Sequence, residues 1–207
     1  IKYIAVVLLG MGIHITCVYG GMFKLFTKEK IMPFLKKFTS VAAITFSTAS
    51  SNASVPASME ILEELGVGKT TRSFTIPMGA TINMDGTAIM QGVAVIFVAQ
   101  AFGINLDFMD YITVIATATM ASIGTAGVPG VGLITLSMVF ASVGLPVEGI
   151  ALIMGIDRIL DMTRTAVNIT GDAICTTIVA YQNKDVDIEV FNEEKEAVEI
   201  DGSEVII

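Results

Sequence analysis

The chain has 207 residues, of which 53% are hydrophobic and 15% charged, and its mean hydropathy is +0.75. Soluble domains are about 25% charged, so this composition argues against a soluble domain and favours an integral membrane protein. The net charge of −8 says little about partners, because the acidic residues crowd residues 182–207. We expect this segment to be a solvated, disordered tail, and we expect no nucleic-acid partner.

Residues 1–23 form a nearly uncharged apolar run that is long enough to cross a bilayer as one helix. The run is too long for a signal peptide and has no clear cleavage site, and no initiator Met precedes it, so we expect a C-terminal portion of a longer protein. His14 stands alone in this run, where a packed or lipid-facing imidazole is favoured over a ligand. Cys17 and Cys175 lack the spacing of disulfides or metal sites, and both are expected to be buried.

Two apolar segments are interrupted by small and polar residues. Residues 24–37 form a basic loop, and residues 38–66 then contain "STASSNASVP", which includes Pro56. Residues 108–146 repeat the pattern around "SIGTAGVPGVG", which includes Pro129. Such residues break a helix at membrane depth, where irregular backbone is tolerated if it lines a cavity. We therefore expect two re-entrant hairpins, each with its proline at the tip.

Each hairpin precedes a helix with a polar centre. Residues 70–104 are interrupted by "NMDGT", and residues 148–181 contain "DRILDMTRTAVNITGD". A hairpin and a polar-centred helix thus occur twice, and paired interruptions of this kind are typical of transporter binding sites. Basic residues gather in residues 24–37 and 69–72, so the positive-inside rule places these loops and the C-terminal tail in the cytoplasm. The two hairpins then enter the membrane from opposite sides.

The helix at residues 148–181 carries five charges on one face. On a helical wheel with about 100° per residue, they fall within roughly a third of the circumference. They are Asp157, Arg158, Asp161, Arg164 and Asp172. An ion-pair network that only joins helices is one interpretation. Because charges at membrane depth are costly, a functional site facing protein or a cavity is the favoured one.

The acids at membrane depth outnumber the bases by two when Asp85 of "NMDGT" is included. Bound cations would balance this excess, and Asp85 and Asp172 are the natural candidates because glycine and amide residues adjoin them. The string "GTAGVPGVG" is not a nucleotide loop, since no lysine follows it. Its N–H groups suit a flexible gate that meets a carboxylate, and a plain tight turn is the alternative.

Four strings, "SSNASVP", "GATINMDGTA", "ASIGTAGVPG" and "DMTRTAVNITGD", occur in this order. Together they resemble the dicarboxylate/amino acid:cation symporter family, the glutamate transporter homologues, over about Phe38 to Tyr181. The resemblance implies an all-α membrane protein with an inverted repeat, an elevator-type transport domain, and a homotrimer formed through a scaffold domain outside this chain. It implies sodium- or proton-coupled uptake of acidic amino acids across the cell membrane, and no enzymatic activity.

The resemblance also implies roles for individual residues. Asp161 would hold the substrate ammonium, and Arg164 would grip the side-chain carboxylate, which suits a guanidinium fork. The other implied substrate-binding residues are Ser50, Ser51, Met84, Thr87, Val128, Gly132, Thr165 and Asn168. One sodium ion would bind among Gly79, Asn83, Asn168 and Asp172, a second among Thr81, Ser122, Ile123 and Thr125, and a third at Asp85.

The chain departs from the family pattern in its arginines. Members carry an arginine at the position of Ala49 or of Met162, and Arg158 is the candidate substitute for either. Asp161 favours an amino acid over a plain C4-dicarboxylate, because its carboxylate would repel succinate. The alternatives are a proton-coupled glutamate symporter, a C4-dicarboxylate symporter and, from another class, an anion-conducting channel. A membrane-embedded enzyme is disfavoured, because no nucleophile–base pair occurs.

Overall fold

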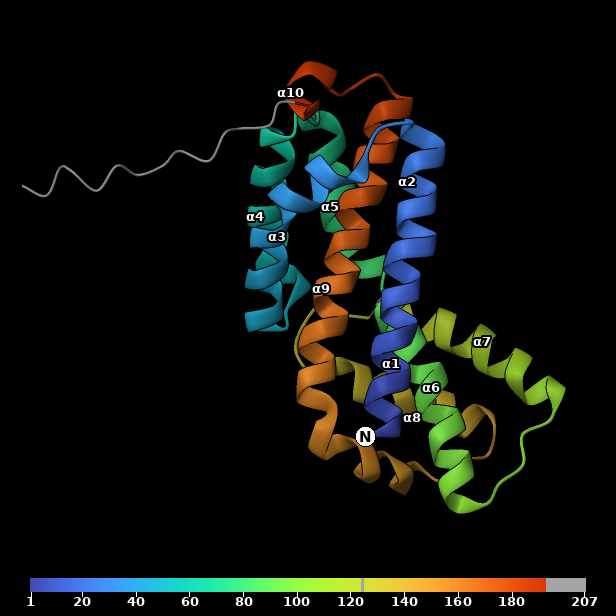
Figure 1. Ribbon diagram of the computed structural model, residues 1–207. Coiled ribbons are helices and arrows are strands. Elements are labelled where there is room, and N and C mark those ends of the chain that lie inside the picture. The colour runs from blue at the N-terminus through green and yellow to red at the C-terminus, as the bar shows by residue number, and fades with distance from the viewer. Residues whose placement is uncertain (124, 193–207) are drawn as a thin grey trace, which may run out of the picture.

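A computed structural model of the chain describes residues 1–123 and 125–192 (Figure 1). These residues are mostly α-helical, and between them they hold no strand beyond an isolated antiparallel bridge that joins Val67 to Val186. The predicted all-α class is therefore confirmed for this part of the chain. Two helical stretches, Lys2–Thr27 and Lys69–Phe102, are long and apolar enough to cross a membrane.

The first stretch is one rod with an irregular turn in its middle. α1 (Lys2–Ile13) passes through a π-helical turn, η1 (His14–Tyr19), into α2 (Gly20–Thr27). A single π turn inside an α-helix frequently marks a functional site. The predicted basic loop at residues 24–37 is mostly helical instead, because α2 continues into it and the next helix begins at Ile31.

Hairpin 1 consists of α3 (Ile31–Thr48) and α4 (Ser51–Glu64). The chain reverses at Ala49, which has a left-handed backbone with φ of 52°, and the Ser50 side chain then caps the first turn of α4. Pro56 lies inside α4, so its placement at the tip is wrong. The left-handed residue and the serine cap, rather than the proline, separate the two helices.

The predicted break within residues 70–104 is confirmed. α5 (Lys69–Ile82) and α6 (Asp85–Phe102) are separate helices with a polar junction between them. Hairpin 2 follows and consists of α7 (Phe108–Ser122) and α8 (Val131–Ser142). The connection between its two helices approaches hairpin 1 from the other end of the molecule (Figure 1).

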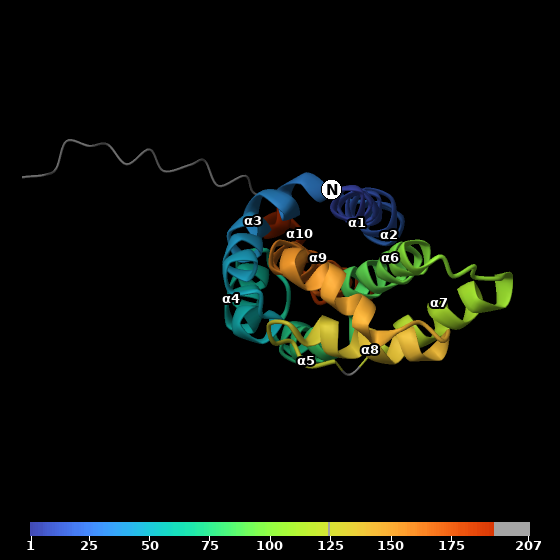
Figure 2. The same ribbon diagram turned by 90° about the horizontal axis from the view of Figure 1, so that it is seen from below.

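The long helix α9 (Ala151–Gln182) begins after a short 3-10 turn, η2 (Val147–Ile150), and forms the centre of the fold. It packs against α1 to α6, which surround it in the view along its axis (Figure 2). The base of hairpin 1 lies at the end of the molecule where α9 stops, and the base of hairpin 2 lies where α9 starts (Figure 1). Both tips therefore reach the middle of α9.

The chain remains ordered beyond α9. A bend and a short helix, α10 (Ile188–Asn192), follow it, and the Phe191 side chain is fully buried. The prediction of disorder is thus wrong for residues 183–192, although most of them are exposed as predicted, and residues 193–207 lie outside the described part of the chain.

Both cysteines are exposed, which contradicts the expectation that they are buried. Cys17 lies in the π-helical turn, and Cys175 lies on α9 beside a cavity. Apolar neighbours in the sequence did not predict burial: the neighbours of Cys175 are buried on other faces of α9, whereas Thr16 and Val18 beside Cys17 are exposed.

Candidate functional site

The two hairpin tips meet beside α9 and close a small cavity. The Ser50 hydroxyl and the Asn52 N–H both donate to the carbonyl oxygen of Gly127 in hairpin 2, at 2.8 and 3.2 Å. Glycine is required at position 127, since a Cβ there would lie 2.9 Å from Asn52 Oδ1 and 3.0 Å from Ser51 Cβ. The cavity measures about 10 Å³, the size that a single water molecule needs. The structure therefore shows a closed site.

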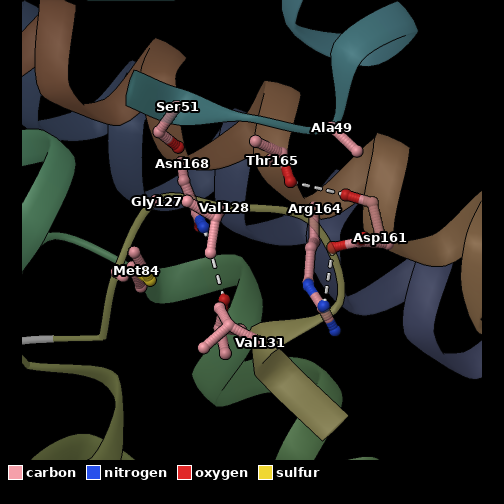
Figure 3. A pocket seen from close by; sticks show the side chains of 12 residues that line it. Ala49, Ser51, Met84, Gly127, Val128, Val131, Asp161, Arg164, Thr165 and Asn168 are labelled. Atoms are coloured by element: carbon pink, nitrogen blue, oxygen red, sulfur yellow. Dashed lines mark hydrogen bonds and ion pairs between the residues drawn. The ribbon is translucent and has the colours of Figure 1, made fainter. Parts of the chain in front are cut away.

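The cavity gathers most of the predicted substrate-binding residues from both hairpins, α6 and α9 (Figure 3). Those that line it are Ser51, Met84, Thr87, Val128, Asp161, Arg164, Thr165 and Asn168. Ser50 lies in the contact between the tips. Gly132 lies behind the arginine, and a Cβ on it would be 2.5 Å from Arg164 Cζ. All ten residues are thus brought to one place.

A buried charge network occupies the α9 side of the cavity. Arg164 Nη2 donates to Asp161 Oδ1 at 2.7 Å, and Arg164 Nη1 lies 3.6 Å from Asp157 Oδ1. The other oxygen of Asp161 accepts a hydrogen bond from the Gly130 N–H of hairpin 2 at 2.9 Å. Asp157, Asp161 and Arg164 are 4%, 4% and 2% exposed. Buried charges persist only when they are paired, so one arginine shared by two carboxylates can exchange a partner for an incoming ion.

Polar side chains fix the junction between α5 and α6 against α9. The Gly86 N–H at the start of α6 donates to Asn168 Oδ1 at 2.8 Å, and Asn168 Nδ2 donates to Thr87 Oγ1 at 3.4 Å. Gly86 permits this approach, because a Cβ on it would lie 2.9 Å from the Arg164 carbonyl oxygen. The Thr165 hydroxyl donates to the Asp161 carbonyl oxygen at 2.6 Å. These contacts hold the amide and hydroxyl groups around the charge network.

Arg158 does not share the buried face. It is exposed, whereas the other four charged residues of α9 are buried, so the prediction that all five point the same way is wrong for this residue. Arg158 stands at the edge of the charged arc and near the start of α9, where fewer helices cover the surface. It does not line the cavity, and the hypothesis that it replaces the missing family arginines is not supported.

The first predicted sodium set is brought together next to the cavity. Asn83 Nδ2 donates to Asp172 Oδ1 at 2.8 Å and lies 3.5 Å from the Asn168 carbonyl oxygen. Asp172 Oδ2 is buried without a hydrogen-bond partner among the described residues. A Cβ at Gly79 would lie 2.8 Å from Asp172 Oδ1, so the glycine leaves the carboxylate accessible. An orphaned carboxylate oxygen near backbone carbonyls fits a hard cation such as sodium.

The second predicted sodium set is less well assembled. Ser122 and Thr125 are buried, whereas Thr81 and Ile123 are exposed. The three hydroxyls bond within their own segments, to the carbonyl oxygens of Met78, Thr119 and Ala121. Gly127 brings hairpin 2 close to the end of α5, where its Cβ would lie 3.2 Å from the Ala80 carbonyl oxygen. Gly124 lies outside the described residues.

Asp85, the predicted third site, already has two partners from the first helix. His14 Nε2 lies 2.9 Å from Asp85 Oδ2, and the Tyr19 hydroxyl donates to the same oxygen at 3.0 Å. His14 is thus packed, as expected, and its imidazole contacts a carboxylate that the sequence did not assign to it. The two rings also contact each other, with centroids 4.5 Å apart. The two residues are five positions apart, a spacing that the π-helical turn brings onto one face.

The sequence matches the model of the sodium:dicarboxylate symporter family over residues 1–182. The chain belongs to this family. An excitatory amino acid transporter of Caenorhabditis elegans is 43% identical over 183 residues, which cover 88% of this chain and 36% of the relative. The mouse neutral amino acid transporter B(0) is 43% identical over 173 residues, covering 83% and 31%. Mouse excitatory amino acid transporter 5 is 40% identical over 180 residues, covering 86% and 32%.

The family and these relatives are named as transporters, not as enzymes, and family membership identifies the chain as a membrane protein. The chain spans about a third of the length of the relatives that it matches. The relatives' names divide between excitatory and neutral amino acid transporters, so similarity alone does not choose the substrate.

Proposed function

We propose that this chain carries the substrate site of a sodium-coupled symporter of acidic amino acids. The buried pairing of Arg164 with Asp161 beneath the two hairpin tips carries the proposal. An acidic amino acid has one ammonium group and two carboxylates. Asp161 suits the ammonium, and the Arg164 guanidinium suits the side-chain carboxylate as a two-pronged donor. The hairpin tips at Ser50 and Val128 would then contact the α-carboxylate of the bound substrate.

The arginine favours an acidic over a neutral substrate. A neutral side chain gives Arg164 no anionic partner, so the guanidinium would stay bound to Asp157 and Asp161. Arg164 would then remain on the Asp161 carboxylate and compete with the substrate ammonium for it. Uptake of neutral amino acids is the second candidate, because the neutral amino acid transporter B(0) is among the relatives.

Sodium coupling follows from the unpaired charge around Asp172. A cation there would satisfy the orphaned oxygen and hold Asn83 and Asn168, and Asn168 also borders the substrate cavity. Each ligand would then tighten the binding of the other by the same factor. Asp85 is the candidate for a further cation, and coupling to protons is the alternative.

The architecture that we propose extends beyond this chain. The hairpins are re-entrant, entering from opposite sides of the cell membrane, and the base of hairpin 1 and the C-terminal residues face the cytoplasm. The whole unit moves as the transport domain of an elevator. A scaffold in the remainder of the protein would join three copies, and membrane lipid would cover the exposed apolar surface.

Reconstitution of the complete protein in liposomes tests the proposal. Uptake of labelled aspartate and glutamate is measured under an inward sodium gradient, an inward proton gradient and no gradient. We expect accumulation with sodium alone, and serine should compete weakly. Accumulation driven only by a proton gradient would show that the coupling ion is the proton and not sodium. Conduction without accumulation would identify a channel. No response to either gradient would exclude a symporter.

A further inference from the structure

The ten residues Asn183–Asn192 follow α9 and fold over one end of the molecule, where α10 lies above α9 (Figure 1). The match to the model of the symporter family ends at residue 182, just before this segment. The contacts of the segment reach α3 of hairpin 1, the turn between α4 and α5, the start of α5, α2 and α9.

Asp185 supplies the N-terminal cap that α5 lacks. The N-cap residue of α5 is Gly68, which has no side chain to accept the first N–H groups. Asp185 Oδ2 accepts hydrogen bonds from the Thr71 N–H at 3.3 Å and from the Thr71 hydroxyl at 2.6 Å. A Cβ at Gly68 would overlap this carboxylate, and the Gly68 N–H donates to the Asp185 carbonyl oxygen at 2.7 Å. The glycine therefore makes room for a cap from a distant residue, which a carboxylate provides well.

Backbone pairing holds the turn between α4 and α5. Val67 and Val186 form the antiparallel bridge, and the Asp187 N–H donates to the Gly66 carbonyl oxygen at 2.9 Å. Gly66 has φ of +75°, and a Cβ on it would lie 2.7 Å from the Asp187 carbonyl oxygen. The turn at the base of hairpin 1 is thus shaped to receive the segment.

An aromatic anchor secures the far end of the segment. Phe191 is 0% exposed and packs against Phe23 of α2 and Tyr181 of α9, with ring centroids 6.1 and 5.8 Å apart. Lys37 of α3 donates to the Val190 carbonyl oxygen at 3.4 Å and to the carbonyl oxygen of the last residue of α4 at 3.5 Å. The segment therefore contacts α3 directly, Lys37 bridges it to the end of α4, and its aromatic anchor reaches α2 and α9.

We propose that Asn183–Asn192 is a strap that locks hairpin 1 and α5 to α9. The strap stays closed during transport. Hairpin 2 has no share in the strap contacts described above. The role of the strap during transport rests on the proposed transport function. The stabilising effect of the strap on the fold can be measured without transport.

A disulfide across the strap tests whether it stays closed. Val67→Cys and Val186→Cys are introduced together into the complete protein with Cys17 and Cys175 replaced by serine. Opposite residues of an antiparallel pair have Cα atoms about 4.5–5.5 Å apart, which a disulfide can span. We expect the oxidised protein to bind aspartate and to retain sodium-driven uptake within about twofold of the reduced protein, and each single cysteine serves as control.

Loss of uptake on oxidation, restored by reduction, would overturn the proposal, because the strap would then have to open. Failure of the two cysteines to join would also overturn it. If the parent protein shows no uptake at all, the proposed function fails, whereas the lock is still judged by thermal unfolding.

Thermal unfolding of truncated and substituted proteins measures the lock directly. We expect termination after Gln182 to lower the melting temperature clearly, and termination after Asn192 to leave it unchanged. If the shorter protein does not fold, Asp185→Ala provides the test, with an expected fall of about 2–4 °C from the lost cap. Glu189→Ala removes an equal but exposed charge from α10 and is the matched control. Equal melting temperatures for the two variants would contradict the strap.

Discussion

The two hairpins have similar shapes but are held in different ways. The helices of hairpin 1 pack against α9 and bury Phe34, Phe38 and Val41, and the strap fixes their base. The helices of hairpin 2 pack mainly on each other and on α6, and Ile115 and Met120 are 64% and 74% exposed. Hairpin 2 meets α9 where the Gly130 N–H donates to Asp161 Oδ2 and where Gly132 lies against the Arg164 guanidinium. The difference predicts that hairpin 1 stays fixed against α9 and that hairpin 2 separates from the site more readily.

The largest effect is expected where hairpin 2 closes over the arginine. Arg164→Cys should lower aspartate uptake about 100-fold, because removing one member of a buried charge pair costs roughly 2–5 kcal/mol. Some binding of neutral amino acids should remain, as measured by competition with serine. Arg158→Cys, which removes an exposed arginine from the same helix, should behave like the parent. Unchanged aspartate affinity in Arg164→Cys would remove this residue from the substrate site.

The next effect concerns the cation that we place between α9 and the end of α5. Asp172→Asn should raise the sodium concentration for half-maximal uptake about 10-fold or more, since an amide carries no charge to attract the ion. Glu148→Gln, at an exposed position before α9, is the control. A sodium dependence equal to that of the parent would exclude Asp172 as a ligand.

The contact between the tips can be broken from the hairpin 2 side. Gly127→Ala places a methyl group 2.9 Å from Asn52 Oδ1 and 3.0 Å from Ser51 Cβ, so the tips must separate. We expect aspartate affinity to fall about 10-fold, as overpacking costs roughly 1–3 kcal/mol. Gly92→Ala adds the same methyl group where nothing lies within 4 Å and should leave affinity unchanged. Equal behaviour of the two variants would mean that the tips need not meet.

The smallest expected effect is in local stability. Amide hydrogen exchange in α7 and α8 should be faster than in α3 and α4, because hairpin 2 has fewer buried contacts. Sodium and aspartate together should slow exchange in hairpin 2 several-fold and change hairpin 1 by less than about twofold. Equal protection of both hairpins would remove the distinction between them.

The local elements were predictable because their causes are local. Small residues within apolar runs predicted both hairpins, and the string "NMDGT" predicted the break before α6. Helical periodicity predicted one shared face for the five charged residues of α9, and four of them are buried on that face. The pairing of Asp161 with Arg164 followed from the same periodicity, whereas the place of Asn168 beside them was implied by the family resemblance. The sequence misplaces the hairpin 1 tip at Pro56, because a proline suggests a turn. The chain reverses instead at Ala49, whose left-handed backbone cannot be read from the sequence.

The remaining errors concern contacts between distant segments. Tyr19 reaches Asp85 across α9 at Gly171, where a side chain would overlap the phenol, and no pattern in either segment marks this crossing. The strap was hidden by composition, because acidic residues around Phe191 resemble a solvated tail. The strap binds at Gly68, a single glycine that leaves room for the Asp185 carboxylate. Asp185 is more than 100 residues away in the sequence, so no local pattern links the two.

The Gly127 carbonyl oxygen receives two donors, the Ser50 hydroxyl and the Asn52 N–H, both from hairpin 1. Both donors belong to hairpin 1, so withdrawal of this one oxygen would remove both hydrogen bonds between the tips. A dye pair placed across the tips of the complete protein should therefore report the loss of this contact as an increase in the distance between the two hairpins.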